Sequence, residues 1–377
     1  MPLATAEPQI ETPLLRSQMP ELDAVRGIAV LMVMLYHAYY WGMDLSKFAP
    51  AKRLLLTAAW TGRLGVNLFF VLSGFLITGL LIDQRTRPDY YKRFYIRRTL
   101  RILPAFLVTL AVLLVTRSAP LSFVLLSFAN LANLTPLFGV AIFYPVLWSL
   151  AVEEHFYLLW PALVRNLSNR AILAVCALIV LLSPVIRLVS YYLALRKGWL
   201  SYHVFDYTWN SSDGLACGAF LAIFLREFQP SRKTLARSLA LLLALAISVW
   251  ILGTPFGIFS RRLPLGAALQ IVPWNLAFTA FLGFVLLLGS SPLNRWARSA
   301  ALEFLGKISY GLYLYHLLFF NGIQWLVYHG YLRGVQIEPF LGLSVRFLVV
   351  GTVSILAAYL SRRFIEDPFL RLKDRFS

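Results

Sequence analysis

The chain has 377 residues, of which 59% are hydrophobic and only 14% are charged. Soluble domains carry about 45–50% apolar and about 25% charged residues, so this composition excludes an ordinary soluble enzyme and a disordered chain. Lys and Arg outnumber Asp and Glu by 35 to 17, which gives a net charge of +18. The two cysteines lie inside apolar runs, which does not indicate a secreted domain built on disulfides.

Long apolar runs recur along the sequence. A membrane-spanning helix needs about 20 mostly apolar residues. Ten stretches approach that length: 24–41, 63–83, 102–117, 146–164, 171–194, 212–228, 238–254, 269–289, 304–328 and 340–362. Asn130, Asn133 and Pro136 interrupt a further apolar segment at 121–138, which favours a half-span or an interfacial helix. The sequence therefore predicts an all-α, polytopic integral membrane protein with about ten transmembrane helices.

The basic residues predict the orientation. The polar segment 1–20 has no apolar signal-peptide core, so we expect a cytoplasmic tail followed by a membrane domain at 21–365 and a basic cytoplasmic tail at 366–377. With the N-terminus inside, the inner loops and tails hold 19 Lys and Arg residues against 8 in the outer loops. This bias predicts a multi-pass protein of the cytoplasmic (inner) membrane with both termini in the cytoplasm. Because topology accounts for the charge, no nucleic-acid partner is expected.

Two ionisable residues lie in the first predicted span. Arg26 and His37 are eleven residues apart. That spacing is about 16 Å along a helix and about three full turns, so both side chains share one face. Ionisable groups inside a bilayer are costly and usually mark a pathway or a site. Alternatively, His37 has only a structural role and is hydrogen-bonded between packed helices.

The fourth predicted span contains the run Glu153, Glu154 and His155. Glu153 lies at a depth similar to that of His37, and a carboxylate beside an imidazole fixes its tautomer and raises its basicity. Successive residues differ by about 100° around a helix, so only one of the two carboxylates is expected to face His37. The alternative is a buried ion pair with Arg187 or Arg346.

In the ninth predicted span, His316 lies at about the depth of His37, and Ser309 and Tyr313 lie near the same face of that helix. An aromatic packing stripe with a hydrogen-bonded histidine explains this pattern equally well. The sequence has no HExxH motif and no pair of cysteines at metal-ligand spacing, so no metal site is expected.

A basic pair precedes Pro104 at the start of the third predicted span. Arg98 and Arg101 are three residues apart and so share a helical face. Arginine binds phosphate with bidentate geometry, which favours a phosphate-rich ligand. The alternative is topological anchoring or contact with the headgroups of membrane lipids.

Six motifs follow one another along the chain. They are Leu22–Ala29 with His37, Gly65–Phe75, Arg98–Pro104, Trp148–Tyr157, Ile308–His316 and Phe364–Phe369. In number, order and spacing they resemble the acyltransferase-3 family of integral-membrane O-acyltransferases, which includes O-antigen and exopolysaccharide O-acetyltransferases. One position departs from the family pattern, because His155 stands where Gln is usual, and this change is expected to alter acceptor contacts.

The resemblance implies a reaction and its participants. The donor would be acyl-CoA, most often acetyl-CoA, with its phosphates on Arg98 and Arg101. The acceptor would be a hydroxyl of a carbohydrate or glycoconjugate. His37 would act as a base or acyl carrier, Glu153 would orient it, and Arg26 would line the donor entrance. Further candidates for substrate contacts are Ser73, Tyr157, Ser309 and His316.

Longer family members carry a second, esterase-like soluble domain. This chain ends 15 residues after its last predicted span. We therefore expect the membrane domain either to take up the acceptor directly or to pass the acyl group to a separate protein on the acceptor side.

Three alternatives to acetyl transfer stay open. A transporter or flippase of a lipid-linked sugar would also contain buried charges, but it would not turn over a thioester. A non-catalytic membrane scaffold would tolerate loss of His37 and Glu153. The same scaffold could also transfer a succinyl group or a longer acyl chain.

Overall fold

The computed structural model describes residues 14–16, 18–39, 48–196, 206–289, 291–331 and 339–372, and all regular secondary structure in these ranges is helical. In chain order the α-helices are α1 (Pro20–Tyr39), α2 (Pro50–Trp60), α3 (Gly65–Asp83), α4 (Tyr90–Val115), α5 (Leu121–Phe128), α6 (Val146–Asn166), α7 (Asn169–Arg196), α8 (Thr208–Ser211), α9 (Asp213–Glu227), α10 (Arg232–Gly253), α11 (Pro264–Leu269), α12 (Val272–Leu288), α13 (Ala300–Lys307), α14 (Ser309–Tyr328), α15 (Pro339–Ser361) and α16 (Asp367–Leu372). The predicted all-α class is confirmed.

Seven helical stretches are long and apolar enough to cross a membrane: Pro20–Tyr39, Pro50–Asp83, Tyr90–Val115, Asn169–Arg196, Arg232–Phe256, Pro264–Leu288 and Phe340–Leu372. A helix hydrogen-bonds its own backbone N–H and C=O groups, which the lipid core of a membrane cannot satisfy, so such stretches can lie within it. The remaining three predicted spans are the helices α6, α9 and α14, so the count of about ten is not confirmed. α6 contains three consecutive titratable residues, and α9 is only 15 residues long.

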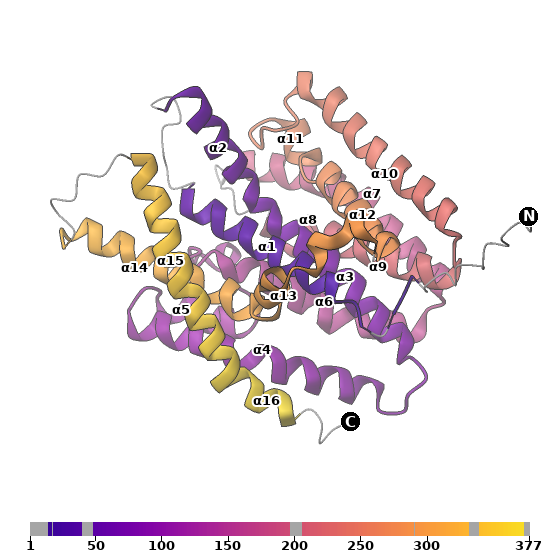
Figure 1. Cartoon of the computed structure of the whole chain (residues 1–377), viewed down its shortest axis with the longest axis horizontal. Coiled ribbons are helices and arrows are strands. Elements are labelled where there is room, and N and C mark those ends of the chain that lie inside the picture. The colour runs from indigo at the N-terminus through magenta and orange to yellow at the C-terminus, as the bar shows by residue number, and fades with distance from the viewer. Residues whose placement is uncertain are drawn as a thin grey trace, which may run out of the picture.

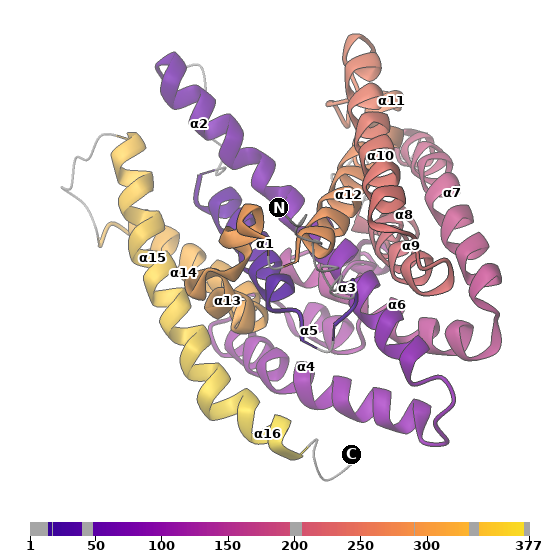
Figure 2. The ribbon, with the colours of Figure 1, turned by 45° about the vertical axis from the view of Figure 1, so that its right-hand side comes forward.

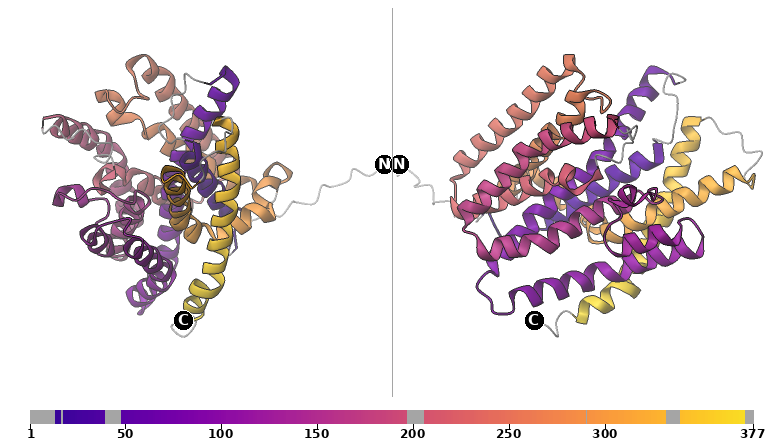
Figure 3. Two further views of the ribbon diagram at one scale, coloured as in Figure 1. Left: turned by 90° about the vertical axis from the view of Figure 1, so that its left-hand side faces the viewer. Right: turned by 180° about the vertical axis from the view of Figure 1, so that it is seen from behind.

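Helix α1 lies between two groups of helices (Figure 1). It packs against α13, α14 and α15 on one side and against α3 on the other. In the second group, α9 packs against α3 and α7, and α12 packs against α10 (Figure 2). Helix α4 runs beneath both groups and contacts α16 close to the end of the chain (Figure 3). This arrangement surrounds the middle of α1 with protein.

Glycines let the backbones of α1 and α13 touch. A Cβ at Gly27 would lie 2.3 Å from the carbonyl oxygen of Leu302, and a Cβ at Gly306 would lie 1.9 Å from that of Asp23. Any larger residue would force the two helices apart, because real Cβ atoms do not approach so closely. The contact fixes the part of α1 that carries the neighbouring Arg26.

The interrupted segment 121–138 is irregular, as predicted. Helix α5 ends at Phe128, Asn130 has a positive φ of 60°, and a short 3₁₀ helix follows at Thr135–Phe138. The side chain of Asn133 is fully buried and donates hydrogen bonds to Thr208 Oγ1 at 2.8 Å and to the carbonyl of Asp206 at 3.3 Å. These contacts tie the broken segment to the residues at the start of α8.

The last long helix continues past its predicted inner end. After α15, a π-helical turn at Arg362–Glu366 leads directly into α16. The turn buries Glu366 to 1% exposure, and the Arg362 Nε lies 2.7 Å from an oxygen of Asp367. A π-turn contains one more residue than an α-helical turn, so it changes which side chain faces inward. A regular 3.6-residue period along the sequence does not reveal this change. Helical structure therefore crosses the predicted boundary at 365, and residues 373–377 of the predicted tail lie outside the described residues.

Candidate active site

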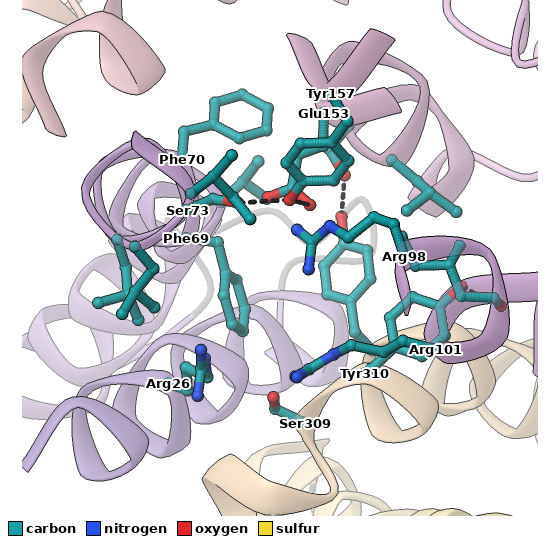
Figure 4. Close-up of a pocket in the computed structure, with 18 residues that line it drawn as sticks. Arg26, Phe69, Phe70, Ser73, Arg98, Arg101, Glu153, Tyr157, Ser309 and Tyr310 are labelled. Carbon is teal, nitrogen blue, oxygen red and sulfur yellow. Dashed lines mark hydrogen bonds between the residues drawn. The ribbon is translucent and has the colours of Figure 1, made fainter. Parts of the chain in front are cut away.

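One cavity lies among α1, α3, α4, α6 and α14 (Figure 4). It encloses about 130 Å³, whereas a single water molecule needs about 10–15 Å³. Its polar lining comes from Arg26, Ser73, Arg98, Arg101, Ser149, Glu153, Tyr157, Ser309, Tyr310 and Tyr313. Seven of the nine site residues predicted from the sequence therefore line this one cavity, and the two exceptions are His37 and His316.

The lining of the cavity is strongly basic. Three guanidinium groups, those of Arg26, Arg98 and Arg101, face a single carboxylate from Glu153. Arg98 and Arg101 share a face of α4 as their spacing predicts, and Arg26 is paired with Asp23 one turn earlier on α1. The buried Nε atom of Arg98 has no hydrogen-bond partner. An excess of guanidinium donors in a partly enclosed space favours an anionic ligand.

A chain of hydrogen bonds holds Glu153 at the cavity wall. Tyr157 donates from its hydroxyl to Glu153 Oε2 at 2.9 Å, and the same hydroxyl is hydrogen-bonded to Ser73 (Figure 4). Tyr157 and Glu153 are four residues apart on α6 and so lie one above the other. Of the two adjacent carboxylates only Glu153 lines the cavity, while Oε1 of Glu154 has no hydrogen-bond partner.

His155 has its hydrogen-bond partner on α8. Its Nδ1 lies 2.6 Å from Thr208 Oγ1, the same oxygen that accepts from Asn133. The residue that departs from the family pattern thus links α6 to α8 and to the interrupted segment. It is not among the cavity-lining residues.

The two histidines predicted at one depth are in direct contact. His316 Nε2 lies 3.1 Å from His37 Nδ1, and the ring centroids are 5.0 Å apart. Tyr313 connects this pair to the cavity, since it lines the cavity and its ring centroid is 6.0 Å from that of His316. Ser149, on the cavity wall, is hydrogen-bonded to the Tyr313 hydroxyl at 2.5 Å.

The predicted contact between Glu153 and His37 is not among the contacts of the described residues. Glu153 accepts from Tyr157, whereas His37 is bonded to the Val33 carbonyl and to His316. Equal depth along two helices does not determine which helices are neighbours, and α14, rather than α6, supplies the residue beside His37.

The alternative ion pairs of Glu153 are not formed either. Arg187 is fully buried and pairs with Asp213 at 2.9 Å. Arg346 lies over the ring of Phe320, 5.2 Å from its centroid. Glu153 instead remains hydrogen-bonded to Tyr157 at the cavity wall.

Two further polar residues, Ser149 and Tyr310, line the cavity and were not among the site residues predicted from the sequence. Ser149 lies four residues before Glu153, and Tyr157 lies four after it, so this spacing places all three on one face of α6. The Tyr310 hydroxyl donates to the carbonyl of Ile102 at 2.9 Å, which ties α14 to α4 just beyond Arg101. No sequence pattern signals that contact.

Metal ligands are not grouped in the part of the chain that the structure describes. No set of three or more His, Cys, Asp and Glu side chains there is arranged to hold an ion. The polar groups that line the cavity are guanidinium groups, hydroxyls and one carboxylate, and the imidazole pair of His37 and His316 lies beside them.

The fold and the cavity define a helical protein with several helices long and apolar enough to cross a membrane and a basic cavity lined by α1, α3, α4, α6 and α14. Comparison with protein families identifies the particular class. Residues 19–363 match the family model of the acyltransferase domain, and the chain belongs to this acyltransferase-3 family. The resemblance drawn from the six motifs is thereby confirmed.

Several curated relatives carry functional names. The peptidoglycan O-acetyltransferase OatA of Listeria monocytogenes is 29% identical over 334 residues, which cover 80% of this chain and 49% of the relative. The O-acetyltransferase OatA of Staphylococcus aureus is 28% identical over 393 residues, which cover 93% of this chain and 57% of the relative. The chain thus spans about half the length of the curated relatives it matches. No solved structure is significantly similar to the chain.

Proposed function

We propose that this protein is a membrane-embedded O-acyltransferase that moves an acyl group, acetyl in the first instance, from cytoplasmic acyl-CoA to a hydroxyl of a carbohydrate or glycoconjugate. One observation carries the proposal: a cavity with three guanidinium groups lies next to a histidine pair, in a chain of the acyltransferase family. The names of the two relatives favour an acetyl group and a sugar of peptidoglycan as the acceptor to test first.

The charge of the cavity fits the donor. Coenzyme A carries phosphates, which guanidinium groups bind with paired hydrogen bonds. Arg98 and Arg101 bind these phosphates, and Arg26 assists from α1. Arg26 and His37 are eleven residues apart on α1, or about 16 Å along the helix. An extended acyl-pantetheine arm bridges such a separation, so the phosphates stay at the arginines while the thioester reaches the histidines.

The reaction is a direct acyl transfer. His37 takes the proton of the acceptor hydroxyl while the hydroxyl oxygen bonds to the thioester carbonyl carbon. The carbon–sulfur bond then breaks, and the CoA sulfur receives the proton from the His37 imidazolium. The products are the acyl ester and free CoA. Transient acylation of His37 itself is the second route that an imidazole can take.

Glu153 acts on the donor side of this reaction. It holds the hydroxyl of Tyr157, whose ring lies under the Arg98 guanidinium, with the Cζ atom 3.9 Å from the ring centroid. Its carboxylate also offsets part of the positive charge of the cavity. Ser73 and Ser309 line the same space and supply hydroxyl contacts to the substrate arm.

The proposed topology places the donor and acceptor on opposite sides of the cytoplasmic membrane. The basic residues around the start of α4 face the cytoplasm with both termini, in line with the bias of Lys and Arg toward inner loops. Membrane lipids surround the apolar helices. The acceptor approaches from the outer side, either directly or through a separate protein that carries the acyl group onward.

Thioester turnover tests the proposal. Purified protein in nanodiscs is mixed with acetyl-, succinyl- or longer acyl-CoA and with peptidoglycan fragments, and both free CoA thiol and O-acylated product are measured. We expect acetyl-CoA to be consumed with matching product, and His37→Ala to abolish both signals. Transport of a lipid-linked sugar in reconstituted vesicles without thiol release would support the flippase alternative. Equal turnover by His37→Ala would remove His37 from the chemistry.

A further inference from the structure

The hydrogen bonds around His37 and His316 determine which ring nitrogens carry protons. His37 Nδ1 lies 3.0 Å from the carbonyl oxygen of Val33, and His316 Nδ1 lies 3.1 Å from that of Leu312. A carbonyl oxygen only accepts hydrogen bonds, and a neutral imidazole has a single N–H. In the neutral state both rings therefore carry their proton on Nδ1, and both Nε2 atoms are acceptors.

The contact between the rings follows from this assignment. His316 Nε2, which has no proton, faces His37 Nδ1 at 3.1 Å. His37 Nδ1–H is thus shared between the Val33 carbonyl and His316 Nε2. The remaining nitrogen of His37, Nε2, keeps its lone pair and is the only ring nitrogen of His37 that can take a proton.

We propose that His316 is the positioning residue of His37: it accepts the Nδ1–H of His37, fixes that ring as a base through Nε2, and stabilises the imidazolium that forms when Nε2 takes a proton. The inference rests on the proposed function, in which His37 is the base. In serine hydrolases a buried aspartate performs this task. Here a neutral imidazole on α14 performs it, so one positive charge is added to the pair when the acceptor hydroxyl is deprotonated.

The surroundings of His316 suit a fixed partner. Its side chain is fully buried, and the rings of Tyr313 and Phe320 lie 6.0 and 6.3 Å from its centroid. Its own Nδ1–H is anchored on the helix backbone at Leu312. Because His316 is fully buried, packs beside Tyr313 and Phe320 and is hydrogen-bonded through Nδ1 to Leu312, its ring cannot turn away from His37 without breaking these contacts. The arrangement also explains why Glu153 can be engaged elsewhere, by Tyr157.

Three substitutions separate positioning from simple packing. In His316→Gln the amide oxygen reaches the place of Nε2 and can still accept from His37. His316→Asn reaches only the Nδ1 position, and His316→Phe fills the space without any acceptor. We expect kcat to fall about 100-fold in the Asn and Phe variants, a typical loss for general-base catalysis, and to stay within about tenfold of wild type in Gln. KM for acetyl-CoA should remain within about twofold, because the arginines are unchanged.

A second measurement needs no substrate. The chain contains five histidines. Protein labelled with ¹⁵N-histidine in lipid is examined by solid-state NMR for a correlation between one protonated and one unprotonated ring nitrogen across the pair. We expect the correlation in wild type and its loss in both His37→Ala and His316→Phe.

The outcomes distinguish this inference from the proposed function. A protonated Nε2 on His316, or wild-type kcat in His316→Phe, would overturn the positioning role. Equal loss of activity in Gln, Asn and Phe variants that fold normally would also overturn it, because packing rather than an acceptor would then matter. If the correlation is present but no acyl-CoA is turned over, the imidazole pair stands and the proposed function fails.

Discussion

The guanidinium group of Arg98 lies over the ring of Tyr157, with its Cζ atom 3.9 Å from the ring centroid. The hydroxyl of the same tyrosine is bonded to Glu153 and to Ser73. Tyr157 therefore has two separable functions: its ring supports an arginine of the basic cavity, and its hydroxyl links α6 to α3.

Substitutions at Tyr157 should separate these functions. Tyr157→Leu removes the ring, and we expect acetyl-CoA to bind about 2- to 30-fold more weakly, the range of a cation–π contact. Tyr157→Phe keeps the ring, so affinity should change less than twofold while the links to Glu153 and Ser73 are lost. Isothermal titration calorimetry in nanodiscs measures both. Equal weakening in Phe and Leu would show that the hydroxyl, and not the ring, supports the binding of the donor.

The arginines of α4 should differ in their effect on donor binding according to whether they line the cavity. Arg101→Gln removes one guanidinium from the lining, and we expect affinity for acetyl-CoA to fall about tenfold or more, because a hydrogen bond between charged groups is lost. Arg93→Gln is the matched control on the same helix. Arg93 is not among the cavity-lining residues and pairs loosely with Asp89 at 3.8 Å.

The chemical origin of that loss can be tested with a truncated donor. Acetyl-pantetheine has no phosphates, so its turnover should be the same in wild type and Arg101→Gln. The affinity of wild type for acetyl-CoA should also fall as salt is raised, and less steeply in the variant. If Arg93→Gln weakened binding as much as Arg101→Gln, the cavity would not be the site of the phosphates.

Helical periodicity accounts for the part of the site that could be predicted. It places Arg98 beside Arg101 on α4 and sets Glu153 four residues from Tyr157 on α6. It also brings His316 to the depth of His37, and the two rings are in contact. Periodicity along one helix, however, contains no information about which helix lies beside it. It therefore does not predict that His37 is hydrogen-bonded to His316 while Glu153 is bonded to Tyr157, nor the π-helical turn that buries Glu366.

A buried ion pair between Arg187 and Asp213 joins α7 to α9. Arg187 and Asp213 are 0% and 2% exposed, and Arg187 also donates to the carbonyls of Ala268 and Asn210. Asp213→Ala leaves the guanidinium buried without its counter-charge, and we expect a destabilisation of about 3–5 kcal/mol. The double variant Arg187→Met, Asp213→Leu should be less destabilised, because neither charge is left unpaired.

Thermal unfolding in detergent measures both effects. Neither residue lines the cavity. The protein that remains folded should therefore bind acetyl-CoA like wild type. A double variant as unstable as Asp213→Ala would show that the hydrogen bonds of Arg187 to the backbone, rather than its charge pairing, dominate.

Close packing at Gly74 holds Ser73 in the cavity wall. A Cβ at Gly74 would lie 2.0 Å from the carbonyl oxygen of Leu215, so the backbones of α3 and α9 touch there. Gly74→Ala must push the two helices apart, and we expect a lower unfolding temperature together with reduced acyl transfer, since Ser73 moves with α3. Gly322→Ala is the matched control, because nothing lies within 4 Å of its added Cβ. An unchanged unfolding temperature in Gly74→Ala would mean that α3 and α9 are not in backbone contact, and the placement of Ser73 at the cavity would lose its structural basis.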